Sequence, residues 1–504
     1  MLMVLTLACA WIPFEPRMPE AGLDPSWMIA VNEAAARSMA FGRDLIFTYG
    51  PLAVLYTRVY HPGTDAMALV ASIPVFAGYV AALWILAAGR TGLLLVASSL
   101  AIGALVHLPD PMVFWYPLLV LACADRLLPA GAPDRASRLA AFALLCVPFG
   151  LLPLVKGSML ISCGAVAGLL GLQLVIERRW PAVAVLVGVP TFTLLAGWVA
   201  VGQPVDALFD YFRWITPIIS GYTAAMSSLG PSWEPLAVVA GSAVVLAALW
   251  LGMAGRPRRP MTLLAYALSL FLAFKGGFVR HDGHALVAGG FVLLASLSMV
   301  MAAPTPWTAA ALLPAALVWG AIYGQYLPLG VGPIVDAWRN TYASAWQGAV
   351  DRLADPDAAH RAYRAALARI DREAGLLPLE GRADIYSHRQ ADLIASGARW
   401  SPRPVFQSYS AYTPALAELN RRHLTGAGAP DSIAFRVEPI DGRVPAGEDG
   451  ASWPALLAAY RPVAFRDDVL TLRRAAGAVV PEPRGTDGAP IQAEMGAPVA
   501  VPTG

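Results

Sequence analysis

Long apolar runs alternate with short polar connectors over the first two thirds of the chain. Most of these runs approach the roughly 20 residues that an α-helix needs to cross a bilayer. The first, MLMVLTLACAWI, is shorter, and we count it as the first of about eleven spans. The other runs lie at about 66–88, 91–108, 111–128, 139–155, 157–176, 181–201, 233–253, 261–275, 284–303 and 306–328. The pattern predicts a polytopic α-helical membrane protein with a transmembrane domain over residues 1–330.

The pattern changes past about Val331, where charged sequence replaces the apolar runs. Amphipathic helices are predicted over 334–375, where apolar residues recur at helical spacing: Trp338, Tyr342, Trp346, Val350 and Leu353. Four short strands are predicted further on, at 383–386, 405–407, 432–437 and 469–472. They alternate with helices predicted near 389–396, 413–425 and 453–460. This alternation is typical of a small α/β domain, here over 331–476, and the Pro-, Gly- and Ala-rich tail 477–504 is predicted to be disordered.

Composition agrees with the membrane interpretation and excludes several other classes. The 504 residues are 57% hydrophobic, with a mean hydropathy of +0.57. The net charge of +2 is small, and the sequence shows no basic patch typical of nucleic-acid binding. The four cysteines all lie in apolar runs, which leaves no disulfide framework or zinc spacing. Walker A, dinucleotide-binding, HExxH and GxSxG motifs are absent from the sequence, so soluble nucleotide and hydrolase chemistries have no support.

Arginine clusters between the apolar runs indicate the orientation. If residues 13–65 are extracytoplasmic, the arginine-rich connectors fall on the cytoplasmic side, at 89–91, 126–138, 177–179 and 255–260. The same assignment places Lys156, the 202–232 loop, the segment Lys275–His284 and the α/β domain outside.

Within the loop 13–65, the stretch Leu23–His61 is a polar, aromatic island between two apolar segments, and Asp24 lies at its start. Asp24 followed by Pro25 is a standard helix start, with the aspartate as N-cap of a helix over 25–40. A carboxylate beside Trp27 at the membrane surface can also accept a proton from a sugar hydroxyl. The local pattern permits both interpretations.

The order of residues in this island resembles a known family. An acidic residue follows the first apolar run, a helix with small residues comes next, and Gly42-Arg43-Asp44 and Tyr49-Gly50-Pro51-Leu52 lead to the second run. This order resembles the first extracytoplasmic loop of the GT-C glycosyltransferases, in the branches of the protein O-mannosyltransferases and aminoarabinose transferases. Those branches carry an acidic pair and a later Pro-Pro-Leu, where this chain has Asp24-Pro25 and Tyr-Gly-Pro-Leu.

The resemblance implies inverting transfer of a sugar from a polyprenyl-phosphate donor to a saccharide, lipid or protein acceptor. The reaction is expected at the outer face of a bacterial cytoplasmic (inner) membrane, with the C-terminal domain extracytoplasmic. Asp24 is then the general base. Asp44 is a second acidic residue for substrate hydroxyls or for a divalent metal, or alternatively a solvated aspartate paired with Arg43 or Arg58. Trp27, Tyr49 and Arg58 are candidates for substrate binding.

A phosphate leaving group needs cations at the membrane interface. The segment KGGFVRHDGH offers Lys275, Arg280, His281 and His284 at the outer end of a span. The alternatives are an interfacial anchor with an Arg280–Asp282 pair, or a metal site made by the two histidines and a carboxylate. Lys156 is a further phosphate candidate, with snorkelling as its alternative, while Asp110 between two prolines is predicted to be a turn residue.

Gln407–Pro414, QSYSAYTP, is dense in hydroxyl and aromatic groups. It predicts either a sugar-binding surface or a strand-to-helix turn with Thr413 as N-cap. Two other function classes also remain. One is a transporter or flippase of lipid-linked saccharides, for which we see no internal repeat; the other is a noncatalytic envelope-assembly protein.

Overall fold

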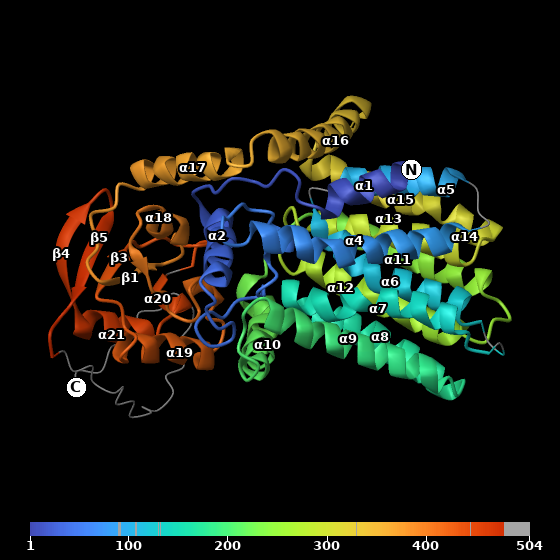
Figure 1. Ribbon diagram of the computed structural model, residues 1–504, viewed down its shortest axis with the longest axis horizontal. Helices are drawn as coiled ribbons and strands as arrows, with labels where there is room; N and C mark the ends of the chain where they lie inside the picture. The colour runs from blue at the N-terminus through green and yellow to red at the C-terminus, as the bar shows by residue number, and fades with distance from the viewer. Residues whose placement is uncertain are drawn as a thin grey trace.

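The computed structural model contains a helical bundle and a smaller α/β domain, with the polar island of residues 23–61 between them (Figure 1). It describes residues 1–477 except 89–91, 106–107, 130, 132, 329 and 444. The predicted disordered tail, 477–504, therefore lies outside the described residues apart from Gly477.

Eight of the helices in the described ranges are long and apolar enough to cross a membrane. They are α4 (Asp65–Ala87), α7 (Ala136–Val155), α8 (Ser158–Ile176), α9 (Trp180–Ala200), α11 (Trp233–Gly252), α12 (Arg259–Phe278), α13 (Ala285–Ala302) and the continuous pair α14 (Pro306–Ala310) and α15 (Leu312–Tyr326). Each coincides with a predicted run. Three other predicted runs form α1 (Leu2–Trp11) and α5 (Gly92–Leu105), which are short, and α6 (Pro109–Leu127), which carries three charged residues.

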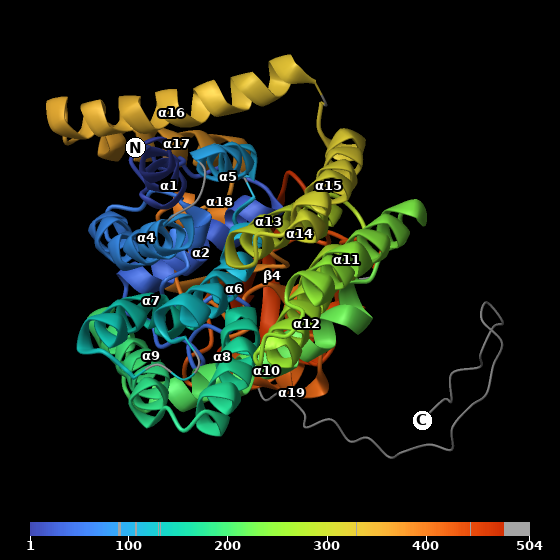
Figure 2. The ribbon, with the colours of Figure 1, turned by 90° about the vertical axis from the view of Figure 1, so that its right-hand side faces the viewer.

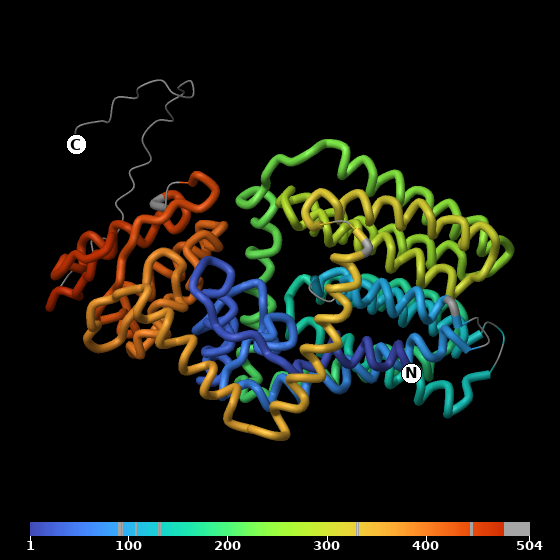
Figure 3. The backbone as a smooth tube through the Cα atoms, turned by 90° about the horizontal axis from the view of Figure 1, so that it is seen from above, coloured from blue at the N-terminus to red at the C-terminus, as the bar shows by residue number. Residues whose placement is uncertain are grey.

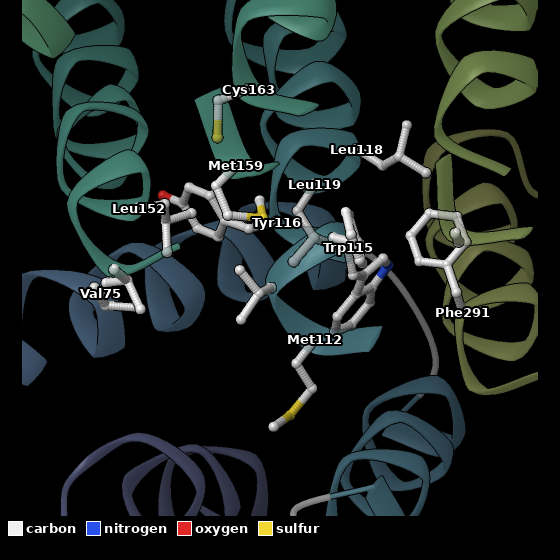
Figure 4. Packing of buried hydrophobic residues seen from close by; sticks show 14 of the residues in the cluster. Val75, Met112, Trp115, Tyr116, Leu118, Leu119, Leu152, Met159, Cys163 and Phe291 are labelled. Carbon is white, nitrogen blue, oxygen red and sulfur yellow. The ribbon is translucent and has the colours of Figure 1, made fainter. Parts of the chain in front are cut away.

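The two innermost helices of the bundle are α6 and α13. Every residue of α6 from Pro111 to Ala124 is buried, and so is α13 from Ala285 to Met301. Figure 4 shows Trp115 and Tyr116 of α6 among side chains of α8 and α13. The outer helices expose large apolar side chains instead, such as Trp84 and Phe192, which are 68% and 71% exposed. An apolar exterior around a packed centre is what a bilayer-embedded bundle requires.

The α/β domain is built on a five-stranded sheet of order β2-β1-β3-β5-β4. The strands are β1 (Arg382–Tyr386), β2 (Arg399–Trp400), β3 (Ser432–Phe435), β4 (Tyr460–Arg466) and β5 (Val469–Arg474). The first three run parallel, and β5 and β4 continue the sheet antiparallel. Its helices include α18 (Gln390–Ala395), α19 (Pro414–Thr425), α20 (Pro445–Glu448) and α21 (Ser452–Ala459). The strands predicted at 383–386, 432–437 and 469–472 are confirmed as β1, β3 and β5, with slightly different ends, whereas residues 405–407 do not form a strand.

Loops at the carboxyl ends of the parallel strands connect the two domains. The amide of Ile46 donates to the carbonyl of Pro404 at 2.7 Å, and the rings of Phe47 and Phe406 lie 5.2 Å apart. Arg37, just after α2 (Leu23–Ala36), donates to the carbonyl of Trp400 at 2.8 Å. The polar island is therefore packed between the bundle and the sheet, as the blue segment in Figure 3 shows.

Two long helices, α16 (Val331–Ala354) and α17 (Ala358–Ala374), lead from the bundle to the sheet (Figure 1). Both were predicted as amphipathic helices. The apolar residues predicted on α16 do not share one buried face, however, because Trp346, Val350 and Leu353 are exposed.

Candidate functional site

Asp24 lies in the first turn of α2, and its side chain is exposed. The helix begins at Leu23 with Gly22 as its N-cap, so the prediction that Asp24 is the cap of a helix over 25–40 is wrong. The carboxylate instead accepts a hydrogen bond from Nε1 of Trp27 at 3.0 Å. A negative charge in the first turn is favourable because the helix dipole is positive there. The side chain is thus held through one oxygen, while the other oxygen has no hydrogen-bond partner among the described residues.

Asp24 lines a cavity of about 980 Å³ that is bordered by residues of α2, of the loop after α1 and of α16. The loop after α1 forms one wall and contributes Arg17 and Glu20. The opposite wall is α16, which presents Asn340, Thr341 and Ser344. Arg58 also lines the cavity, so an acidic and a basic group share it with several neutral hydrogen-bonding groups.

Arg58 is held without a carboxylate partner among the described residues. Its Nη2 donates to the carbonyls of Cys9 and Ile12, both at 3.2 Å, at the end of α1. Burial, and then the neighbouring Arg17, lower the pKa of the Arg58 guanidinium. An arginine keeps its proton despite such shifts. Arg58 is therefore a half-buried positive charge whose Nη2 is held by two backbone carbonyls.

An aromatic layer lies behind Asp24. Trp27 stacks on Tyr49 with a centroid distance of 4.5 Å and an interplanar angle of 9°. Nζ of Lys156 lies 5.4 Å from the ring centre of Tyr49 and 5.1 Å from that of Tyr56. The same ammonium contacts both carboxylate oxygens of Asp110 at 2.7 and 2.9 Å, and the Tyr56 hydroxyl donates to Asp110 at 3.1 Å. A continuous set of contacts therefore joins Asp110 to Asp24.

Sequence reasoning missed this ion pair. Lys156 neither snorkels nor remains free, and Asp110 is not a simple turn residue but the first-turn acid of α6 that neutralises Lys156. One signal was present, since Lys156 is one of only two lysines in the chain. Burial is the main reason that the pKa values of Tyr49 and Tyr56 are raised, and Asp110 and Asp24 raise them further. Both hydroxyls are therefore protonated donors at neutral pH.

The Tyr-Gly-Pro-Leu motif has a structural reason. Residues 48–52 run beside the end of α7, where the amide of Gly50 donates to the carbonyl of Val155 at 3.1 Å. A Cβ on Gly50 would lie 2.4 Å from the Leu154 carbonyl oxygen, so only glycine allows this approach. The pairing sets Tyr49 opposite Lys156 and thereby builds the aromatic layer.

Three of the four cationic candidates predicted at 275–284 have internal partners. Arg280 contacts Asp282 at 2.8 Å, as one alternative predicted, and also binds both oxygens of Asp441 at 2.6 and 3.0 Å. His281 lies 3.1 Å from Glu234, and His284 lies 2.5 Å from Asp282. Lys275 is exposed in the last turn of α12. Arg280 therefore holds the α/β domain against the bundle through Asp441.

The QSYSAYTP segment contributes to the same region. Thr413 caps α19, as its turn interpretation predicted, by accepting from the amide of Leu416 at 3.4 Å. Tyr409 packs in a cluster with Leu23, beside Asp24, and with Tyr222 of α10 (Ala207–Met226). Burial raises the pKa of Tyr409 most, Asp24 raises it further and Arg280 opposes the rise. Tyr409 thus lies within electrostatic reach of both charges.

Asp44 is placed differently from Asp24. Its exposed carboxylate accepts from the amide of Ala40 at 2.8 Å and closes a turn. The predicted pairing of Asp44 with Arg43 or Arg58 is wrong, because Arg43 contacts Asp206 at 2.9 Å and Asp210 at 2.5 Å. Among the described residues, no group of three or more His, Cys, Asp or Glu side chains is arranged to hold a metal ion.

Comparison with models of known families, with curated proteins and with solved structures gives no match. The likeness of the polar island to GT-C glycosyltransferases therefore stays a prediction. A proposal for function must rest on the contents of the cavity, because a fold alone does not determine activity.

Proposed function

We propose that the protein transfers a sugar from a polyprenyl-phosphate donor to a hydroxyl of an acceptor, with Asp24 as general base. The observation that carries this proposal is that Asp24 and Arg58 line the same cavity. A base and an anion-binding cation in one cavity are what glycosyl transfer from a phosphate-linked donor needs. The apolar exterior of the bundle supports a lipid-linked rather than a soluble donor.

In the proposed reaction, the open oxygen of Asp24 accepts the proton of the acceptor hydroxyl. The acceptor oxygen forms a bond to the anomeric carbon from the face opposite to the phosphate, so the configuration inverts. The bond between that carbon and the phosphate oxygen breaks, and its electron pair leaves with the polyprenyl phosphate. Arg58 and Arg17 stabilise the negative charge that the phosphate gains. The proton on Asp24 passes to solvent, to which its side chain is exposed.

Trp27 positions Asp24 in this proposal. Its indole donates to one carboxylate oxygen and leaves the other for the acceptor. Stacking on Tyr49 fixes the indole, and Tyr49 is fixed by Lys156 and by the backbone pairing at Gly50. Such preorganisation places the base correctly at no cost during the reaction.

We assign the site to the outer face of a bacterial cytoplasmic membrane. Support comes from the opposite end of the bundle, where arginines gather on acidic partners. Arg258 lies 3.0 Å from Asp125 and also contacts Glu177, and Arg179 lies 3.3 Å from Asp134. Arginine-rich connectors favour the cytoplasmic side, and this preference supports an extracytoplasmic position for Asp24 and the α/β domain.

The test is transfer of radiolabelled sugar from a panel of polyprenyl-phosphate sugars by purified protein in lipid vesicles. Asp24→Asn is compared with Glu20→Gln, because Glu20 is another exposed carboxylate that lines the cavity. We expect Asp24→Asn to lower kcat by about 100-fold or more, the range of general-base catalysis, while Glu20→Gln stays within about twofold.

Unchanged transfer by Asp24→Asn would remove Asp24 as the base. An unfolded variant would be recognised by loss of a monodisperse elution peak, which an exposed Asp-to-Asn change is not expected to cause. Lack of transfer from every lipid-linked sugar by the unsubstituted protein would overturn the transferase proposal, and would favour transport or envelope assembly instead.

A further inference from the structure

Helix α16 packs on the bundle with one face. The hydroxyl of Tyr342 lies 2.7 Å from that of Thr6 in α1, and a Cβ on Gly103 of α5 would lie 3.1 Å from the indole of Trp338. Arg352 binds both oxygens of Asp65, at the start of α4, at 2.6 and 2.8 Å. These contacts hold α16 firmly along its length.

A face of α16 beside the one that contacts the bundle is apolar over its second half. Trp346 is 72% exposed, Leu353 is 87% exposed, and Val350 between them is also exposed. Their spacing of four and three residues places them on one stripe of the helix. We call these three residues the α16 stripe. Polar residues flank it on the edge that carries Gln347 and Asp351, which are hydrogen-bonded to each other at 2.7 Å.

The position of α16 indicates what covers the stripe. The helix follows shortly after α15 and runs across the side of the bundle rather than along it (Figure 2). It crosses α1 and α5, which are apolar helices, and α1 itself exposes Leu2 and Leu5. α16 therefore crosses the apolar exterior of the bundle, the surface that lipid would cover in a membrane protein.

We propose that α16 is an in-plane membrane helix whose stripe lies against phospholipid in the outer leaflet. Tryptophan favours this interfacial depth, and a helix with one apolar and one polar edge is stable when it lies in the membrane plane. Behind the stripe, Asn340 and Ser344 line the cavity that contains Asp24. α16 thus forms a wall with lipid on one side and the polar cavity on the other. This inference is independent of the transferase proposal.

The experiment places a nitroxide at single introduced cysteines in the full chain, in vesicles of phosphatidylcholine and phosphatidylglycerol. Trp346→Cys and Leu353→Cys report the stripe, and Gln347→Cys and Asp351→Cys are matched controls on the polar edge. All four substituted residues are exposed, and the four native cysteines are buried, so the unsubstituted chain is the control for labelling. Collision rates of each nitroxide are measured with oxygen, which concentrates in lipid, and with a water-soluble nickel chelate.

We expect the ratio of oxygen to nickel collisions at positions 346 and 353 to exceed the ratio at 347 and 351 by about fivefold or more, because an in-plane helix buries its apolar edge below the headgroups. High nickel collision rates at all four positions would show that the stripe faces water. Low rates with both reagents at 346 and 353 would show that a protein surface covers it. Either result would overturn the proposal.

Discussion

Replacement of Lys156 by methionine tests whether the ion pair with Asp110 supports the aromatic layer. The ammonium contacts both oxygens of Asp110 at 2.7 and 2.9 Å, and the two side chains are only 17% and 14% exposed. Loss of one partner costs about 3–5 kcal/mol for a fully buried pair and at most about 1 kcal/mol for an exposed pair. The intermediate burial leads us to expect a loss of about 2–3 kcal/mol in the free energy of unfolding.

A double-mutant cycle separates the pair from its surroundings. Among the described residues, Lys156→Met leaves the Asp110 side chain with the Tyr56 hydroxyl as its partner, while Asp110→Asn keeps an oxygen for Tyr56 and leaves Lys156 above the two tyrosine rings. In the double variant both charges are absent, so no charge is left without its partner. The decrease in its free energy of unfolding is therefore expected to be smaller than the sum of the two single decreases by about 1.5–3 kcal/mol. The assay is reversible unfolding in mixed micelles with increasing dodecyl sulfate. Losses that add within about 0.5 kcal/mol would refute the reasoning, because independent sites behave in that way.

Two further predictions concern single residues. Gly50→Ala places a Cβ 2.4 Å from the Leu154 carbonyl oxygen and 2.5 Å from the Tyr211 hydroxyl. We therefore expect the free energy of unfolding to fall by about 3 kcal/mol or more in the same assay. Gly188→Ala is the control: a Cβ there meets nothing within 4 Å, so its free energy of unfolding should change by less than about 1 kcal/mol. Burial raises the pKa of Glu448 from 4.5 to about 7, so the folded state favours the protonated carboxyl and loses stability as the pH rises through this interval. Glu448→Gln cannot ionise and should show a smaller fall in melting temperature between pH 5 and pH 8; an equal fall would contradict the assignment.

The sequence was sufficient for most of the bundle because apolar runs of membrane-crossing length have few alternatives. It was less reliable in the α/β domain. Val405 and Phe406 have strand composition, but they are buried by contacts such as that of Phe406 with Phe47, which no local pattern reveals. The strand Tyr460–Arg466 was missed because Arg461, Pro462 and Arg466 obscure its alternation, and such residues are tolerated on an edge strand.

At the site, the sequence identified the neighbours of Asp24 that lie on the same segment. Trp27 is one helical turn away, and the motif at Tyr49 returns the chain to it. It could not identify the Lys156–Asp110 pair, because residues 46 positions apart meet only through the packing of α6 against the end of α7. The ion pairs of the 275–284 segment could not be predicted either, because Arg280 binds Asp441 of the other domain.

The partners of Lys156, Arg280 and Arg58 determine which of these cations can bind a phosphate. An anion that approached Lys156 or Arg280 would have to displace a carboxylate that already binds the cation with two oxygens. An anion at Arg58 would meet no such competitor among the described residues, because the guanidinium is held by the carbonyls of Cys9 and Ile12. These carbonyl oxygens accept hydrogen bonds from Nη2 without cancelling the charge of the guanidinium. Arg58 is therefore a better candidate for phosphate binding than Lys156 or Arg280, in agreement with the role that we propose for the cavity that contains Asp24.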